Sequence, residues 1–118
     1  MRLSVIVPVY NEVDTIAEIL RRVRSVNLTV SIGFGSEAGS TVEPEREIVV
    51  VDDASTDGTR DLLRQLNGES GTKVFFHEQN QGKGAAVRTG LERASGDIML
   101  IQDADLEYDP RDYPALLQ

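Results

Sequence analysis

Apolar residues along the chain follow two alternating patterns, short runs and helical spacing. Residues 3–7 and 48–51 are runs rich in β-branched side chains, which are typical of strands buried on both faces of a sheet. Each run is followed by apolar residues at helical spacing, namely Ile16, Ile19, Leu20 and Val23, and then Leu62, Leu63 and Leu66. The chain is therefore predicted to begin with two consecutive strand–helix units.

The second half of the chain repeats the same pattern. Residues 73–76 predict a third strand, residues 84–94 a third helix and residues 98–101 a fourth strand. The apolar side of this helix is expected to hold Val87, Leu91 and Ala94. Apolar strands that alternate with amphipathic helices predict an α/β fold, with a mostly parallel sheet covered by helices on both faces.

The segment 29–45 differs from the rest of the chain. It is rich in Gly and Ser and has no clear period of apolar residues. It therefore predicts an extended surface loop.

Composition limits the class of protein and its partners. With 118 residues, 40% of them hydrophobic and 27% charged, the chain has the size of one domain with a single core. Its net charge of -8 and its lack of a basic stripe argue against nucleic-acid binding. The absence of cysteine excludes disulfides and thiolate metal sites, and it fits a reducing compartment. No apolar run approaches the roughly 20 residues of a membrane-spanning helix.

Polar residues follow each predicted strand, at the end where open parallel sheets bind ligands. They lie at 8–12, 52–53, 77–84 and 102–105. Asp103 and Asp105 can direct two carboxylates at one Mg²⁺ or Mn²⁺ ion that bridges a diphosphate. An isolated Asp-x-Asp is also common in polar loops and helix caps. The interpretation as a metal site therefore rests on the position of this motif directly after a predicted buried strand. Lys83, near a predicted helix start, is a candidate for phosphate contact.

Other polar residues have simpler interpretations. Residues 53–58 imitate a calcium-binding loop, but Arg64 stands where that loop requires a bidentate Glu. Asp57 or Ser55 is therefore expected to cap the following helix. The single histidine, His77, is expected to be structural or exposed.

Four segments, taken in order, resemble the signature of family 2 glycosyltransferases. They are 7–12 (VPVYNE), 50–59 (VVDDASTDGT), 80–84 (NQGKG) and 102–110 (QDADLEYDP). The last two narrow the resemblance to enzymes that transfer mannose or glucose from GDP or UDP to a polyprenyl phosphate, the dolichol-phosphate type. The resemblance implies the Rossmann-like GT-A fold, and it covers nearly the whole chain except 29–45.

The resemblance implies roles for the residues that match the first two segments. Pro8, Tyr10 and Glu12 are expected to line the nucleotide pocket. Val51 and Asp53 are expected to contact the base. All five follow or end a predicted strand.

The resemblance also implies a metal-dependent, inverting mechanism. Asp103, Ala104 and Asp105 are expected to lie along the ribose and diphosphate. Asp103 and Asp105 are the expected catalytic residues, and Glu107 is expected to join them in holding Mg²⁺ or Mn²⁺. The metal would neutralise the departing nucleoside diphosphate of GDP-mannose or UDP-glucose.

In the resembled family, the acceptor site and any catalytic base come from a later segment. Residues 1–118 are therefore expected to form the nucleotide-sugar-binding part of a longer protein, truncated before the acceptor-binding segment. The acceptor implied is a polyprenyl phosphate, and the location implied is cytoplasmic, at a membrane surface in the complete protein. Apolar surface left uncovered on this part would favour a homo-oligomer.

Two other classes share some of these features. A phosphoacceptor receiver domain has the same length, an α/β fold and a Mg²⁺-binding acid pair, but its acid pair follows the first strand, whereas Asp52 and Asp53 follow the second. A nucleotidyltransferase also combines sugar nucleotides with paired acids. It would normally carry a Gly-rich, basic loop directly after the first strand, where this chain has residues 8–12.

Overall fold

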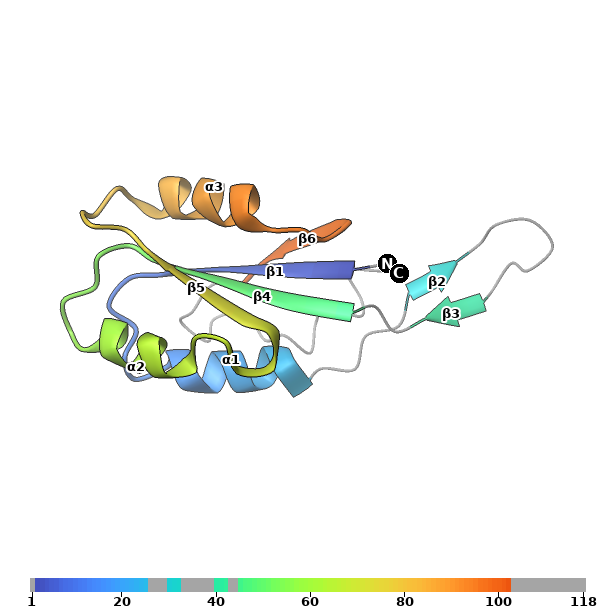
Figure 1. Cartoon of the computed structure of the whole chain (residues 1–118), viewed down its shortest axis with the longest axis horizontal. Helices are drawn as coiled ribbons and strands as arrows, with labels where there is room; N and C mark the ends of the chain where they lie inside the picture. Colours follow the sequence, from blue (N-terminus) through green and yellow to red (C-terminus); the bar gives the residue numbers. More distant parts are fainter. Residues whose placement is uncertain (1, 26–29, 33–39, 43–44, 103–118) are drawn as a thin grey trace.

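A computed structural model describes residues 2–25, 30–32, 40–42 and 45–102 of the chain (Figure 1). The elements follow one another as β1 (Arg2–Val9), α1 (Ile16–Ser25), β2 (Val30–Ile32), β3 (Ser40–Val42), β4 (Glu45–Asp52), α2 (Thr59–Leu66), the short 3-10 helix η2 (Glu69–Gly71), β5 (Thr72–Phe76), α3 (Lys83–Arg93) and β6 (Ile98–Ile101). No helix within these ranges is long and apolar enough to cross a membrane.

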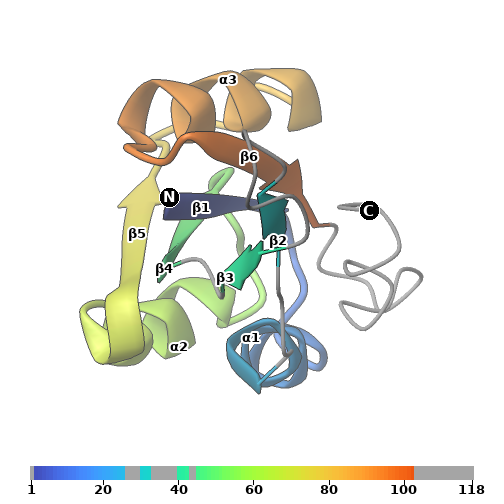
Figure 2. The ribbon, with the colours of Figure 1, turned by 90° about the vertical axis from the view of Figure 1, so that its right-hand side faces the viewer.

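The main sheet has four strands in the order β5-β4-β1-β6, and every pair in it is parallel. Helices α1 and α2 cover one face, and α3 covers the other (Figures 1 and 2). The central strands β1 and β4 are buried along most of their length because both of their faces are covered. This arrangement confirms the predicted α/β class.

The larger core lies between the sheet and helices α1 and α2. Its buried members include alternate residues of the strands and residues from the predicted apolar faces of both helices: Leu3, Val5, Val7, Val9, Ile16, Ile19, Leu20, Val23, Ile48, Val50, Leu63 and Val74. Leu62 and Leu66 pack against this cluster while partly buried. The helical spacing seen in the sequence therefore predicted the buried faces of α1 and α2 correctly.

Helix α3 packs on the sheet through small residues, and its predicted face was only partly right, since Ala94 packs against the core. Its buried residues are Ala86 and Gly90, whereas Leu91 is 40% exposed. A Cβ atom placed on Gly90 would lie 2.4 Å from Cγ2 of Ile6, so the helix backbone sits directly on a side chain of β1. The predicted face included Val87 and Leu91, but large side chains at this contact would hold the helix away from the sheet, and only small ones permit such close approach.

The segment 29–45 contains a hairpin, which corrects the expectation of an extended loop. Strands β2 and β3 pair antiparallel, with Val30 opposite Val42 and Ile32 opposite Ser40. The β-branched residues in these two short strands favour sheet, and the surrounding Gly and Ser obscured that signal in the sequence. The hairpin projects beyond the amino ends of β1 and β4 (Figure 1).

Glu47 of β4 is a fully buried carboxylate that ties the end of α3 to the sheet. Its oxygens accept hydrogen bonds from Ser4 Oγ at 2.7 Å, Lys73 Nζ at 2.8 Å and the backbone N–H of Ser95 at 2.7 Å. Burial alone would raise the pKa of Glu47, but the hydrogen bonds from Lys73, Ser4 and Ser95 outweigh it and lower the pKa from 4.5 to about 2. The carboxylate is therefore held in its charged form.

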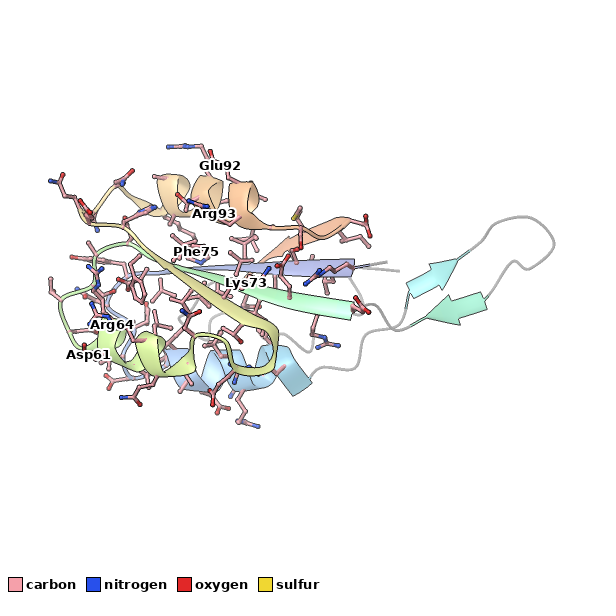
Figure 3. The ribbon with its side chains drawn as sticks, viewed as in Figure 1. Asp61, Arg64, Lys73, Phe75, Glu92 and Arg93 are labelled. Atoms are coloured by element: carbon pink, nitrogen blue, oxygen red, sulfur yellow. The ribbon has the colours of Figure 1, made fainter. Side chains whose placement is uncertain are left out.

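The face that carries Glu47 also holds the Phe75 ring of β5. The guanidinium carbon of Arg93, in the last turn of α3, lies 5.2 Å from the centre of this ring. Figure 3 labels Lys73, Phe75 and Arg93 and shows them along β5 and α3. Helix α3 is thus fixed by a cation–π contact as well as by the hydrogen bond from Ser95 to Glu47 after its last turn.

Candidate functional site

The carboxyl ends of the four parallel strands meet along one edge of the sheet. Backbone hydrogen bonds extend the ladder one residue beyond the strands, from Asp53 N to Val9 O, from His77 N to Asp52 O and from Gln102 N to Ile6 O, each at 2.8 Å. The loops after β1, β4 and β5 and the end of β6 therefore lie beside one another, as the rule for parallel sheets predicts (Figure 1).

The loops after β1 and β4 hold each other through Asn11. Its backbone N–H donates to Ser55 Oγ at 2.9 Å, and its side-chain Oδ1 accepts from the N–H of Thr56 at 2.8 Å. Asn11 adopts a left-handed conformation with φ of 53°, which Asn tolerates better than most residues. The next residue continues the contact, since the N–H of Glu12 donates to Thr59 Oγ1 at 3.1 Å. Together these bonds fix the loop that carries Tyr10 and Glu12.

Asp52 and Asp57 shape the turn that leads into α2. The buried Asp52 carboxylate accepts hydrogen bonds from Ser55 N at 3.1 Å and Ser55 Oγ at 2.5 Å, and it lies 3.6 Å from Arg60 Nε. Asp57 accepts the N–H of Thr59, the first residue of α2, at 3.0 Å. The helix cap position itself is Gly58, so of the two predicted caps Asp57 satisfies the helix terminus and Ser55 does not.

Asp53 lies at the centre of a buried polar network. Its carboxylate is 3% exposed and accepts hydrogen bonds from His77 Nδ1, Gln81 N and Gly82 N, each at 2.8 Å. The other ring nitrogen of His77, Nε2, lies 2.8 Å from Thr89 Oγ1 of α3. Burial alone would raise the pKa of Asp53, but the hydrogen bonds from His77, Gln81 and Gly82 outweigh it, so the pKa is lowered and the carboxylate stays ionised.

This network resolves the expectation for the histidine. His77 is 9% exposed and fully hydrogen-bonded, so of the two predictions, structural or exposed, the structural one is confirmed. The pairing of His77 with Asp53 and Thr89 was not foreseen. A period-two count from Phe75 places His77 on the same face of the sheet as α3, and this was the signal available in the sequence.

The predicted nucleotide-pocket residues differ in their exposure. Tyr10 is 48% exposed, and Glu12 is partly buried and accepts a hydrogen bond from Thr15 Oγ1 at 2.9 Å. Pro8 and Val51 are buried register partners on neighbouring strands. Val51 has no exposed surface and packs beneath α3, so its assigned contact with a base stays a prediction.

The remaining predicted site residues fall into two groups. Lys83 is the exposed first residue of α3, directly after the Gln81–Gly82 turn that binds Asp53. Asp103, Ala104, Asp105 and Glu107 lie outside the described residues. Within the described residues, no group of three or more His, Cys, Asp or Glu side chains could hold a metal ion. The metal site therefore stays a prediction from the sequence.

A parallel sheet whose polar loops gather at the carboxyl edge defines the class of open α/β proteins, which bind their ligands at this edge. Within that class, the chain belongs to the glycosyl transferase family 2, whose family model matches residues 4–118.

Individual relatives and a solved structure agree with the family. The chain is 33% identical over 117 residues to the undecaprenyl-phosphate 4-deoxy-4-formamido-L-arabinose transferase of Pseudomonas fluorescens, covering 98% of this chain and 31% of that protein. It is 33% identical over 118 residues to the dolichol-phosphate mannosyltransferase of Pyrococcus furiosus, covering 100% of this chain and 30% of that protein. The mannosyltransferase PcManGT of Pyrobaculum calidifontis, solved with GDP-Man and Mn²⁺, has a TM-score of 0.69 at 32% identity, covering 93% of this chain and 29% of that one.

These comparisons establish membership of the glycosyl transferase family 2 and the GT-A form of the α/β fold, as expected from the four segments. They also show how much of each relative the chain covers. The chain spans about three-tenths of the length of the relatives that it matches, 31% and 30% for the two transferases.

Proposed function

We propose that this chain binds a nucleoside diphosphate hexose for metal-dependent, inverting transfer to a polyprenyl phosphate. Two similar proteins are named as transferases of a polyprenyl phosphate, with undecaprenyl in one name and dolichol in the other. A third was solved with GDP-Man and Mn²⁺. The GDP-Man in that structure supports a nucleoside diphosphate sugar as the donor, and GDP-mannose and UDP-glucose are the two candidates.

The observation that carries the proposal is the ionised Asp53 carboxylate at the carboxyl edge of the sheet. A carboxylate offers about four acceptor positions, and three here are taken by His77, Gln81 and Gly82. The remaining position, on Oδ2, can accept a ring N–H of guanine or uracil. Cytosine and adenine present an acceptor at the corresponding ring nitrogen, so an ionised Asp53 would repel them.

The metal would be held by the carboxylates of Asp103, Asp105 and Glu107. Their oxygens suit Mg²⁺ or Mn²⁺, which prefer carboxylates shared with phosphates. The described chain brings Gln102, the residue before Asp103, to the same edge as the Asp53 loop through its bond to Ile6 O. When bound, such an ion neutralises charge on the departing nucleoside diphosphate without a proton transfer.

Titration calorimetry with UDP and GDP, each with and without Mn²⁺, tests the proposal. We expect at least one nucleotide to bind, with an affinity that rises when Mn²⁺ is present. The double variant Asp103→Asn with Asp105→Asn should lose this rise, because neutral amides hold hard cations poorly. Asp61→Asn is the matched control, since Asp61 is exposed on α2 and pairs only locally with Arg64 at 2.8 Å (Figure 3). Equal affinity with and without Mn²⁺ would contradict the metal, and binding of neither nucleotide would contradict the proposed function.

The acceptor and the location complete the proposal. A polyprenyl phosphate would be met at the cytoplasmic surface of a membrane, where its lipid part is buried and its phosphate is exposed. Transfer of radiolabelled hexose from GDP-mannose and UDP-glucose to a short polyprenyl phosphate, measured with the complete protein, tests this acceptor. Transfer to water alone, with no lipid-linked product, would contradict it.

A further inference from the structure

We propose that His77 is a positioning residue for base recognition, which fixes the Asp53 carboxylate and is itself fixed by Thr89 of α3. The inference rests on the proposed function, because it assigns Asp53 to the base. It concerns two residues outside the four segments that resemble the family signature. Neither His77 nor Thr89 needs to touch the ligand.

The hydrogen-bond network fixes which ring nitrogen of His77 carries the proton. The ionised Asp53 carboxylate can only accept, so His77 Nδ1, 2.8 Å from Oδ1, must be the donor. In the neutral ring Nε2 is then an acceptor, and it takes the hydroxyl proton of Thr89 at 2.8 Å. The chain of donors therefore runs from Thr89 through His77 to Asp53. Both ring nitrogens are satisfied, so the ring is held from both sides.

His77 determines which part of the carboxylate is left for a ligand. Its Nδ1–H and the N–H of Gln81 both bind Oδ1, while the N–H of Gly82 binds Oδ2. Oδ1 is thereby saturated, and the free acceptor position lies on Oδ2. Without the Nδ1–H donor, Oδ1 regains an open position and the carboxylate can rotate about its bond to Cβ. A base that needs one acceptor in one direction would then bind a less ordered partner.

A purely structural histidine would leave a different signature. His77 is 9% exposed, so any substitution will cost stability through packing alone. Two substitutions separate packing from positioning. His77→Asn keeps a donor at the place of Nδ1, facing Asp53, and loses the contact with Thr89. His77→Gln keeps a polar group at the place of Nε2, facing Thr89, and loses the donor to Asp53.

The experiment is titration calorimetry of the full chain with UDP and with GDP in the presence of Mn²⁺, below the unfolding temperature of each variant. We expect His77→Gln to bind the preferred nucleotide about tenfold more weakly, the loss of one hydrogen bond to a charged group. His77→Asn should recover most of this affinity. Urea unfolding should show similar stability losses for the two variants, since each removes the ring.

A second pair and a control keep the test independent of whether the His77 variants fold. Thr89→Val removes the hydroxyl with little change of shape, and we expect a loss of affinity of about threefold, from a weaker and indirect effect. Thr89→Ser restores the hydroxyl and should rescue the affinity. Glu47→Gln is the control, because Glu47 is also buried and holds the opposite end of α3 through Ser95. It should lower stability and leave nucleotide affinity unchanged.

The outcomes divide cleanly. Weaker binding by His77→Gln than by His77→Asn, together with rescue of Thr89→Val by Thr89→Ser, supports the inference. Equal affinity within either pair overturns it, as does an equal loss in the Glu47→Gln control. If the unsubstituted chain binds neither UDP nor GDP, the proposed function fails and the inference fails with it. Binding by the unsubstituted chain with no difference within the pairs overturns the inference alone.

Discussion

Replacing Gly90 with alanine adds one methyl group at the contact between α3 and β1. The new Cβ would lie 2.4 Å from Ile6 Cγ2, whereas carbon atoms in ordinary contact lie about 3.5–4.0 Å apart. The helix must therefore move away from the sheet by about 1 Å, or Ile6 must change its rotamer. Overpacking of this kind costs about 3 kcal/mol at the upper end of its range, and the better helix propensity of alanine returns about 1 kcal/mol. The expected net loss is about 2 kcal/mol.

Gly84 provides a matched control in the same helix. A Cβ on Gly84 would lie 3.7 Å from Arg88 Nη1, which is ordinary contact with the end of a flexible side chain. Gly84→Ala should therefore gain stability, by up to about 1 kcal/mol. Urea unfolding gives both free energies. In thermal unfolding, the melting temperature of Gly90→Ala should fall by roughly 10 °C.

A double-mutant cycle assigns the loss to the contact itself. Ile6→Ala removes the Cγ2 atom and leaves a cavity, which the methyl group of Gly90→Ala can partly fill. The combined variant should therefore lose less stability than the sum of the two single losses. Additive losses, or a Gly90→Ala variant as stable as Gly84→Ala, would refute the assignment of this glycine to close packing.

Two further predictions follow from the polar contacts. Because the pKa of Glu47 is lowered from 4.5 to about 2, its ionisation stabilises the fold above pH 4.5, and this contribution is lost as the pH falls toward 2. Glu47→Gln should therefore be less stable than the unsubstituted chain at pH 7, but it should lose less stability between pH 5 and pH 3. Urea unfolding midpoints measured at each pH check this, and parallel pH profiles for the two proteins would contradict it. Asn11→Ala should cost about 2 kcal/mol, because it removes the hydrogen bond from Thr56 and places alanine in a left-handed conformation. Asn11→Gly should recover the part of this loss that comes from the backbone conformation. Asn11→Asp should recover most of it, because its carboxylate can accept the same hydrogen bond. The same order in chemical unfolding checks the prediction, and equal losses for Ala and Asp would exclude the side-chain bond.

The period of apolar residues was sufficient to predict the four strands of the main sheet, the three main helices, and the buried faces of α1 and α2. Central parallel strands such as β4 are covered on both faces, so a run like residues 48–51 has few other interpretations. The face of α3 could not be predicted in this way. Counting apolar residues favours Leu91, whereas the actual contact depends on the absence of a side chain at Gly90.

The location of the site could be predicted from the sequence, but the hydrogen bonds between its residues could not. The rule for parallel sheets located the edge where the loops containing Tyr10 and Asp53 meet. The hydrogen bond between His77 and Thr89 joins the end of β5 to a residue of α3 that lies 12 positions later in the chain. Such a contact depends on how α3 is rotated on the sheet, and that rotation is set by Ala86 and Gly90.

Strand β4 and the residue directly after it hold α3 at both ends through two buried carboxylates. Asp53 accepts the backbone amides of Gln81 and Gly82 before the helix, and Glu47 accepts that of Ser95 after it. These three amide protons lie outside the regular hydrogen bonds of the helix, where exchange with solvent is usually fast through fraying. Here each is bound to a carboxylate of the central sheet, so its exchange requires α3 to leave the sheet as one cooperative unit. In native-state hydrogen exchange, these loop amides should therefore be protected as strongly as those in the middle of α3.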